Sequence, residues 1–455
     1  MQVFGSSGTR GIVNESLSPD FIMKVAKAAG TMWSAERVAI GRDTRKTGLM
    51  FANAAASGLA SVGVSVDRLG VIPTPGIQAY AERNDIPGIV ITASHNPPEY
   101  NGVKLIGSDG KELSVNELER VESILLSEQF DNATWDQVGN DTDISNSITA
   151  YLDDIKRAVN LQQFKESQLR IAVDPGHGAG LYTSPRLFRE LGCEVVTVNA
   201  HDDGHFPGRD PEPIAENLAA LGDLVKAANA DIGIAHDGDA DRAIFFDESG
   251  EYIEGDATLA ALADAKLTEG DITVSAVNVS QRLVNVVDET NASLELTQIG
   301  STRIMNRIQE LQKAGNNVPI AGEGNGGVIF PHYRLARDGA YTAVKFIELL
   351  TNGQTASEVV NKYDDYHNVR INIHYESENE RETLLGLAEE TAIKADGEIT
   401  TIDGYRIDYG DAWILVRPSG TEPVVRIYAE SKSKQRAENI ASSMAQKLRE
   451  AIDDA

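Results

Sequence analysis

Residues 88–97 read GIVITASHNP, a short apolar run that ends in a polar loop with Ser94 and His95. The arrangement recurs at residues 37–43 (RVAIGRD), 170–176 (RIAVDPG) and 231–239 (DIGIAHDGD). Short apolar runs bounded by glycine or aspartate are typical of buried strands, and helical patterns lie between these runs. The sequence therefore predicts an α/β protein with buried sheets.

The strand-and-loop unit occurs in three successive pairs, from which we infer three related α/β domains. Two polar stretches, residues 131–147 and 247–256, are expected to separate them. After about residue 366 the pattern changes to alternating strands at 368–375 and 412–416 and an amphipathic helix at 434–452, which predicts a smaller α+β domain. The expected domains are residues 1–149, 150–253, 254–367 and 368–455.

Composition restricts the kinds of partner. The 455 residues carry a net charge of −28, which repels nucleic acid and anionic lipid, so we expect neither as a partner. Cys193 is the only cysteine, so no intrachain disulfide can form. No stretch approaches the roughly 20 apolar residues of a membrane span. We expect a cytoplasmic protein, monomeric or homodimeric, with a small-molecule ligand.

Ser94 follows a predicted buried strand directly and has a histidine beside it. This pair resembles the nucleophile and base of a hydrolase, but the Gly-x-Ser-x-Gly motif is absent, and adjacent side chains on extended backbone point apart. For Ser94 on its own, a polar turn is the preferred interpretation.

Residues 237–242 read DGDADR and place carboxylates at alternate positions. Clustered carboxylate oxygens suit Mg²⁺ or Ca²⁺, because uncompensated carboxylates repel one another. A calcium EF-hand is a competing reading, since Glu248 falls at its twelfth position. Arg242, however, replaces the glycine required at the sixth, and the flanking residues have strand character. The loop favours Mg²⁺, with calcium and a solvated acidic turn as alternatives.

Two further loops have the composition of ligand sites. Residues 417–423 read RPSGTEP, with Arg426 close behind, and turn N–H groups, hydroxyls and two guanidiniums together suit a phosphate. Residues 322–326 read GEGNG, where Glu323 and Asn325 can address neighbouring sugar hydroxyls and glycine allows close approach. Taken singly, each loop is also compatible with an ordinary turn.

Together these loops resemble the α-D-phosphohexomutase family, which includes phosphoglucosamine mutase and phosphomannomutase/phosphoglucomutase. The resemblance spans nearly the whole chain, and the motifs occur in family order. It implies three related α/β domains with mixed sheets and a smaller α+β C-terminal domain, heart-shaped around a central cleft. The motifs are SGTRG at residues 7–11, GRDTR at 41–45, TASHNP at 92–97, DGDADR at 237–242, GEGNG at 322–326 and RPSGTEP at 417–423.

The resemblance also implies a mechanism. Ser94 matches the phosphoserine that passes a phosphoryl group to a hexose monophosphate and takes another back from the bisphosphate intermediate. Hexose 1,6-bisphosphate is therefore the expected activator. Asp237, Asp239 and Asp241 are expected to hold one Mg²⁺ per subunit together with Ser94.

Other residues take binding and electrostatic roles by the same matching. Arg10, Lys104 and Arg242 can neutralise charge around Ser94, as phosphoryl transfer requires. Lys104 matches a lysine often assigned proton transfer, with a purely electrostatic role as the alternative, and His95 is expected to orient the serine or the phosphate. The expected substrate-binding residues are Arg303, Glu323, Asn325, Gly326, Arg417, Ser419, Gly420, Thr421 and Arg426.

The substrate loop departs from many relatives, which carry Ser and His where this chain has Asn325 and Gly327, a variant that looks archaeal. Phosphoglucosamine mutase, which converts glucosamine 6-phosphate to glucosamine 1-phosphate, is the preferred reading. Mannose or glucose phosphate is the rival within the family. Two other classes remain: a non-catalytic sugar-phosphate binding protein and a metal-dependent phosphatase.

An anionic substrate requires a local reversal of the chain's negative charge. Eight basic residues fall in or beside the loops expected to line the cleft, while the acidic surplus is expected on the outer surface. These eight are Arg10, Arg42, Arg45, Lys104, Arg242, Arg303, Arg417 and Arg426.

The acidic surplus predicts a halophilic protein. At roughly 1 M salt the Debye length falls to about 3 Å, which screens the self-repulsion of 69 acidic against 41 basic residues. We expect the fold to be lost at low salt, measured by circular dichroism during dialysis from molar to millimolar KCl. An unchanged spectrum would contradict halophily.

Overall fold

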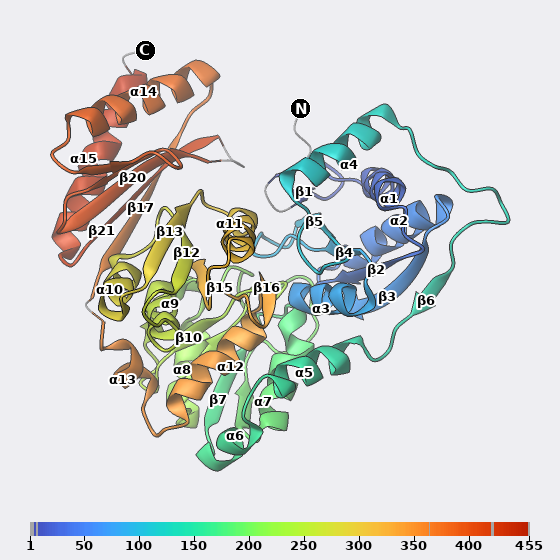
Figure 1. Cartoon of the computed structure of the whole chain (residues 1–455), viewed down its shortest axis with the longest axis horizontal. Coiled ribbons are helices and arrows are strands. Elements are labelled where there is room, and N and C mark those ends of the chain that lie inside the picture. Colours follow the sequence, from blue (N-terminus) through green and yellow to red (C-terminus); the bar gives the residue numbers. More distant parts are fainter. Residues whose placement is uncertain (1–3, 6–7, 364, 420–422, 454–455) are drawn as a thin grey trace. The chain divides into compact units, whose positions relative to one another are not determined.

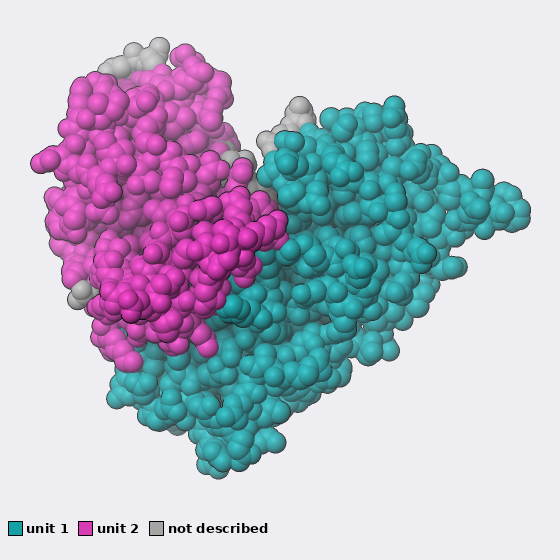
Figure 2. All heavy atoms as spheres, in the orientation of Figure 1, with its two compact units in different colours: residues 1–262, 324–360 teal, residues 263–323, 361–455 magenta. Residues whose placement is uncertain are grey.

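A computed structural model of the chain describes residues 4–5, 8–363, 365–419 and 423–453 (Figure 1). It divides into two compact units, one of residues 1–262 and 324–360 and the other of residues 263–323 and 361–455 (Figure 2). In the part of the chain that the structure describes, no helix has both the length and the apolar composition that crossing a membrane requires.

The first unit begins with a mixed six-stranded sheet in the order β1-β5-β4-β2-β3-β6. Strand β2 runs parallel to β3 and β4, whereas β5 runs antiparallel to β4 and β1. The strands are β1 (Thr9–Ile12), β2 (Arg37–Arg42), β3 (Ser65–Val71), β4 (Gly88–Ile91), β5 (Tyr100–Ile106) and β6 (Asp141–Asp143).

Helices cover both faces of this sheet, as the alternation along β2 requires. Val38 and Ile40 pack with α1 (Pro19–Trp33), α2 (Gly48–Ser61) and α4 (Val115–Ser127), whereas Ala39 packs with α3 (Thr74–Asn84). The predicted buried α/β sheet is confirmed.

The second sheet of this unit has the order β11-β10-β9-β7-β8, with β7 parallel to β8 and β9 and β10 antiparallel to β9. Its strands are β7 (Arg170–Asp174), β8 (Glu194–Thr197), β9 (Ile232–Ala235), β10 (Ile244–Phe246) and β11 (Tyr252–Ile253). Helices α7 (Ser184–Leu191) and α8 (Ala219–Ala228) contact its strands, and α6 (Leu161–Ser167) contacts α7. Helix α5 (Ser147–Arg157) contacts α3, and α9 (Gly255–Asp264) follows β11 in the chain.

Each of the two polar stretches expected to separate domains contains a short strand. Strand β6 extends the first sheet beside β3, and β11 forms a hairpin with β10. All three residues of β6 are exposed, so their backbone pairs with β3 without any apolar side chain to signal a strand.

The first unit also contains β15 (Gly327–Phe330), antiparallel to β16 (Arg334–Arg337), followed by α12 (Gly339–Leu350) and α13 (Ala356–Val360). In the second unit β12 (Ile272–Ala276) runs parallel to β13 (Ser293–Thr297) and β14 (Ala321–Glu323). Helices α10 (Gln281–Thr290) and α11 (Ser301–Lys313) connect these strands.

The second unit ends in an antiparallel sheet in the order β17-β21-β20-β19-β18. Both α14 (Glu378–Lys394) and α15 (Lys434–Asp453) pack on one face, against Ile414 and Val425 among others, which confirms the predicted α+β character. The strands are β17 (His367–His374), β18 (Glu398–Thr400), β19 (Tyr405–Asp408), β20 (Ala412–Pro418) and β21 (Val424–Ser431).

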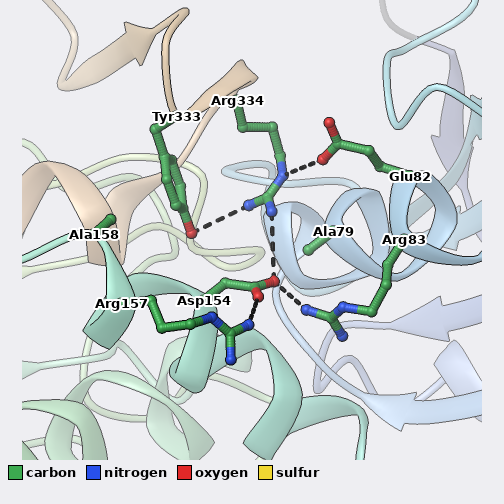
Figure 3. Close-up of a pocket in the computed structure, with 8 residues that line it drawn as sticks. All are labelled: Ala79, Glu82, Arg83, Asp154, Arg157, Ala158, Tyr333 and Arg334. Atoms are coloured by element: carbon green, nitrogen blue, oxygen red, sulfur yellow. Dashed lines mark hydrogen bonds and ion pairs between the residues drawn. The ribbon is translucent and has the colours of Figure 1, made fainter.

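Asp154 of α5 forms ion pairs with arginines from three elements of the first unit. It pairs with Arg83 of α3, with Arg157 one turn along its own helix, and with Arg334 of β16 at 3.7 Å (Figure 3). Arg334 also donates to Glu82 at 3.1 Å. These side chains line a pocket of about 370 Å³ that does not include Ser94.

A buried hydrogen bond also connects α5 to the first turn of α12. The Tyr151 hydroxyl donates to Asp338 Oδ1 at 2.7 Å, and the same oxygen caps α12 by accepting from the Tyr341 N–H at 2.9 Å. Because both Tyr151 and Asp338 are buried, we expect Tyr151→Phe to lower the unfolding free energy by about 1–2 kcal/mol, measured as a lower melting temperature.

Tyr182→Phe is the matched control, because its hydroxyl donates to Asp202 at the surface and the residue is 39% exposed. Its melting temperature should stay close to that of the wild type. Equal shifts for the two variants would contradict the role of the buried bond.

Candidate functional site

Ser94 lies in the loop after β4 and is fully buried. Its φ of 52° is left-handed, a conformation that costs a non-glycine residue roughly 1–2 kcal/mol. In this conformation Oγ donates to Asp237 Oδ2 at 2.8 Å. The serine therefore meets a carboxylate that lies 143 residues further along the chain.

Three carboxylates gather in the loop between β9 and β10, where the sequence predicted a metal site. Asp237, Asp239 and Asp241 are at most 2% exposed, and one oxygen from each lies within 4.8 Å of the others. The Oδ1 atoms of Asp239 and Asp241 are buried and accept no hydrogen bond from the described residues. Buried carboxylate oxygens that lack donors suit a divalent cation, so the residues fit such an ion.

Lys104 and Arg242 compensate these charges. Lys104 Nζ lies 2.8 Å from Asp239 Oδ2 and 3.4 Å from Asp241 Oδ2, and the lysine is 1% exposed. Arg242 Nε lies 3.7 Å from Asp237 Oδ2 and 3.9 Å from Asp241 Oδ1. The cations that the sequence predicted around Ser94 thus converge on the carboxylate loop.

The carboxylates differ in pKa because their neighbours differ. Burial, together with the charges of Asp241 and Asp239, raises the pKa of Asp237 to about 7. Burial acts in the same direction on Asp239, but Lys104 outweighs it and lowers the pKa of Asp239 below its usual value. The carboxylates in turn raise the pKa of Lys104 despite the opposing effect of burial, so this amine stays protonated.

His95 is a neutral acceptor. Burial, followed by the charges of Arg242 and Arg10, lowers the pKa of His95 to about 2. Its Nδ1 lies 3.1 Å from Nη2 of Arg242 and, in the neutral ring, accepts this hydrogen bond. Arg10 donates to Asn96 Oδ1 at 2.8 Å, so the residue two positions after Ser94 is also held.

Arg337 belongs to this cluster and was missed in the sequence. It closes β16, and its Nη2 donates to Asp241 Oδ2 at 2.6 Å. The Asp338-Gly339 pair that follows could have indicated this position. An aspartate that caps a helix marks where the helix begins, so the residue before it lies at the end of the preceding strand.

The predicted sugar loop is divided between the units. In the first unit, the Gly326 carbonyl accepts from the Ala243 N–H at 3.1 Å, and Gly326 has a φ of 86°. A Cβ at Gly326 would lie 2.5 Å from the Ala243 carbonyl oxygen, so glycine is required there. Asn325 is exposed, and its Oδ1 accepts from the Gly327 N–H at 3.0 Å. In the second unit, Glu323 closes β14 and is buried.

The predicted phosphate loop lies in the second unit, between β20 and β21. Arg417 and Arg426 are directly opposite each other in this strand pair, an arrangement in which like charges repel. Arg417 pairs with Asp403 at 3.0 Å, and the Ser419 N–H donates to the Val424 carbonyl at 2.8 Å. Two predicted residues, Gly420 and Thr421, lie outside the described residues.

Two of the remaining basic residues lie at opposite extremes of exposure. Arg303 is exposed in the first turn of α11, in the second unit. Arg45, in one of the loops expected to line the cleft, is 1% exposed, and its guanidinium is enclosed by backbone carbonyls. A side chain with five fixed donors can be buried where so many acceptors converge, which its loop position does not reveal.

Comparison with known proteins agrees with this organisation. Four phosphoglucomutase/phosphomannomutase domain descriptions match the chain: alpha/beta/alpha domain I at residues 1–132, domain II at 149–250, domain III at 254–366 and the C-terminal domain at 371–447. Among solved structures, a phosphoglucomutase/phosphomannomutase family protein from Burkholderia thailandensis is 28% identical, with a TM-score of 0.86 over 99% of this chain and 97% of that one.

Curated relatives match over the same length. A phosphoglucomutase/phosphomannomutase from Thermococcus kodakarensis is 42% identical over 460 residues, which cover 99% of each chain. A probable phosphoglucosamine mutase from Methanococcoides burtonii is 38% identical over 453 residues, which cover 100% of each chain. The chain therefore belongs to the phosphoglucomutase/phosphomannomutase family of α-D-phosphohexomutases, which are isomerases.

Proposed function

We propose that the protein moves a phosphoryl group between C6 and C1 of a hexose phosphate through phosphorylated Ser94. The observation that carries this proposal is the 2.8 Å hydrogen bond from Ser94 Oγ to Asp237, at the edge of a buried carboxylate cluster. A serine that is buried beside three carboxylates and several cations does not serve as an ordinary solvent-exposed hydroxyl. It suits phosphoryl transfer, where positioning and charge neutralisation supply most of the catalysis.

Each half of the proposed reaction exchanges a phosphoryl group for a proton. In the first, the bond between Ser94 Oγ and phosphorus breaks, a bond forms to the sugar oxygen, and the sugar hydroxyl's proton ends on Oγ. In the second, the bisphosphate returns its other phosphoryl group to Oγ, and the serine proton ends on the released oxygen.

The charges of the cluster support this chemistry. Lys104, Arg242, Arg337 and Arg10 face the three aspartates and Glu112, whose Oε1 lies 3.9 Å from Lys104 Nζ, so the group is close to neutral. A phosphoserine carries about two negative charges at pH 7, which a divalent cation would balance. We assign Mg²⁺ to Asp237, Asp239, Asp241 and the serine phosphate, where it would neutralise the transferring group.

The remaining predicted residues are assigned to the substrate. Arg417, Ser419, Gly420, Thr421 and Arg426 are proposed to hold the phosphate that is not reacting. The register that sets Arg417 directly opposite Arg426 supports this role, because it places two cationic side chains on one face of the sheet, where an anion can pair with both. Glu323, Asn325 and Gly326 are assigned to the sugar, and Arg303 to the substrate loop of the third domain.

Glucosamine phosphate is the proposed substrate, supported by several relatives of 36–38% identity that are named probable phosphoglucosamine mutases. Glucose or mannose phosphate is the second candidate, supported by the name of the 42% identical relative. The deciding experiment compares kcat/KM for glucosamine, glucose and mannose 6-phosphates side by side. A higher value for either neutral sugar would overturn the glucosamine assignment.

Replacing the proposed phosphoryl carrier tests the mechanism. We expect Ser94→Ala to abolish isomerisation but leave the protein folded, because the change removes little packing and one buried hydrogen bond, which is worth about 1–2 kcal/mol. Ser108→Ala, in the turn after β5, is the matched control and should retain activity. Normal turnover by Ser94→Ala would refute the phosphoserine mechanism.

The same preparations distinguish a mutase from the other two classes. Intact-mass measurement should find phosphate on Ser94 in active wild-type enzyme, and added hexose 1,6-bisphosphate should raise activity. Release of inorganic phosphate in place of isomer would indicate a phosphatase, and binding without turnover would indicate a sugar-phosphate binding protein.

Metal binding has a readout independent of activity. We expect millimolar Mg²⁺ to raise the melting temperature of the wild type, because a ligand at 100 times its Kd stabilises by about 2.7 kcal/mol. Asp237→Asn should lose most of this shift, whereas the exposed Asp223→Asn should keep it. Identical shifts in both variants would exclude the aspartate cluster as the metal site.

A further inference from the structure

Arg45 lies directly behind the Ser94 loop and uses every donor of its guanidinium there. Nε donates to Asp43 Oδ2 at 3.0 Å. Nη2 donates to the carbonyls of Ser94 at 2.9 Å and Asn96 at 2.6 Å, and Nη1 donates to those of Pro97 at 2.6 Å and Tyr100 at 3.0 Å. One fully buried side chain thus fixes four carbonyls of the loop that presents the serine.

The N–H of Ser94 is fixed from the same ion pair. It donates to Thr92 Oγ1 at 2.8 Å, and that hydroxyl donates to Asp43 Oδ2 at 2.6 Å. Asp43 Oδ1 accepts from the Arg45 N–H at 2.9 Å. Both the N–H and the C=O of Ser94 are therefore connected to the Asp43–Arg45 pair, one through Thr92 and the other directly.

The Asp43–Arg45 ion pair is buried. Asp43, Arg45 and Thr92 are 1% exposed, and the ring of Phe206 covers the guanidinium at 5.2 Å from its centroid. Hydrogen bonds to charged groups in such an environment are stronger than at a surface. They can hold a serine in the left-handed conformation, which persists only where the surrounding structure over-determines it.

We propose that Asp43, Arg45 and Thr92 are the positioning residues that hold Ser94 in its left-handed conformation and so aim Oγ for phosphoryl transfer. None of the three is assigned a contact with the substrate. Without them Ser94 relaxes toward extended backbone, which carries Oγ away from Asp237. This inference rests on the proposed function for its kinetic consequence, but not for its structural one.

Thr92 supplies the sharpest test, because its hydroxyl and its methyl group can be removed separately. Thr92→Val keeps the shape and removes the hydroxyl; Thr92→Ser keeps the hydroxyl and removes the methyl. We expect Thr92→Val to lower kcat by tenfold or more with KM changed less than about twofold, since misplacing a reacting atom by 1 Å can cost about 100-fold. Thr92→Ser should stay near the wild type.

If Thr92 acted only through packing, kcat would fall more in Thr92→Ser than in Thr92→Val, because Thr92→Ser leaves a cavity and Thr92→Val does not. Arg45→Lys is the second variant, since an ammonium cannot reproduce the planar fork of donors. It should lower kcat in the same way as Thr92→Val. Arg68→Lys is its matched control, because Arg68 makes a comparable two-oxygen contact with Asp141 at the surface of the same sheet.

Hydrogen exchange provides a readout that does not depend on the reaction. Amides of residues 94–96, 99 and 100 should exchange at least tenfold faster in Thr92→Val and Arg45→Lys, and at the wild-type rate in Thr92→Ser and Arg68→Lys. Unchanged exchange in the first two variants, or faster exchange without a fall in kcat, would overturn the positioning role. A wild type that isomerises no hexose phosphate would instead refute the proposed function, while the exchange result would still decide the structural claim.

Discussion

Three carboxylates confined within 4.8 Å of one another in a buried loop are the constraint on which the site depends. Like charges at this separation are tolerated only with compensating cations, and the chain draws those from several elements of its first unit. Lys104 comes from β5, Arg242 from the loop itself and Arg337 from the end of β16. The carboxylate loop therefore contacts segments that lie far from one another in the sequence.

Much of the fold could be predicted because its strands carry a strong local signal. The runs at 37–41, 88–92, 170–174 and 412–416 are short and apolar, and each coincides with a strand in the structure, although β4 ends at Ile91. Strand β6 has three exposed polar residues and gives no such signal. Helix α14 buries only Leu384, Ala388 and Ala392, too narrow a stripe to stand out from the polar residues around it.

In the site, too, residues in short sequence motifs could be predicted, whereas contacts between distant segments could not. Ser94 and the three aspartates could be predicted because each stands in a short motif whose residue types suit one chemistry, and the structure brings them together. The burial of Arg45 could not, since it follows from the convergence of four carbonyls that come from residues 94–100. Nor could the contact of Arg337 with Asp241, which depends on the packing of β16 rather than on sequence neighbours.

The order of the two units along the chain has a consequence for biosynthesis. The chain leaves the first unit at residue 263 and returns to it with residues 324–360. Because Arg337 lies in this returning segment, Asp241 lacks one of its cations until 96 further residues have been made. At about 5–20 residues per second, that interval lasts roughly 5–19 s. The nascent first unit thus carries an under-compensated acidic core while the ribosome is still translating.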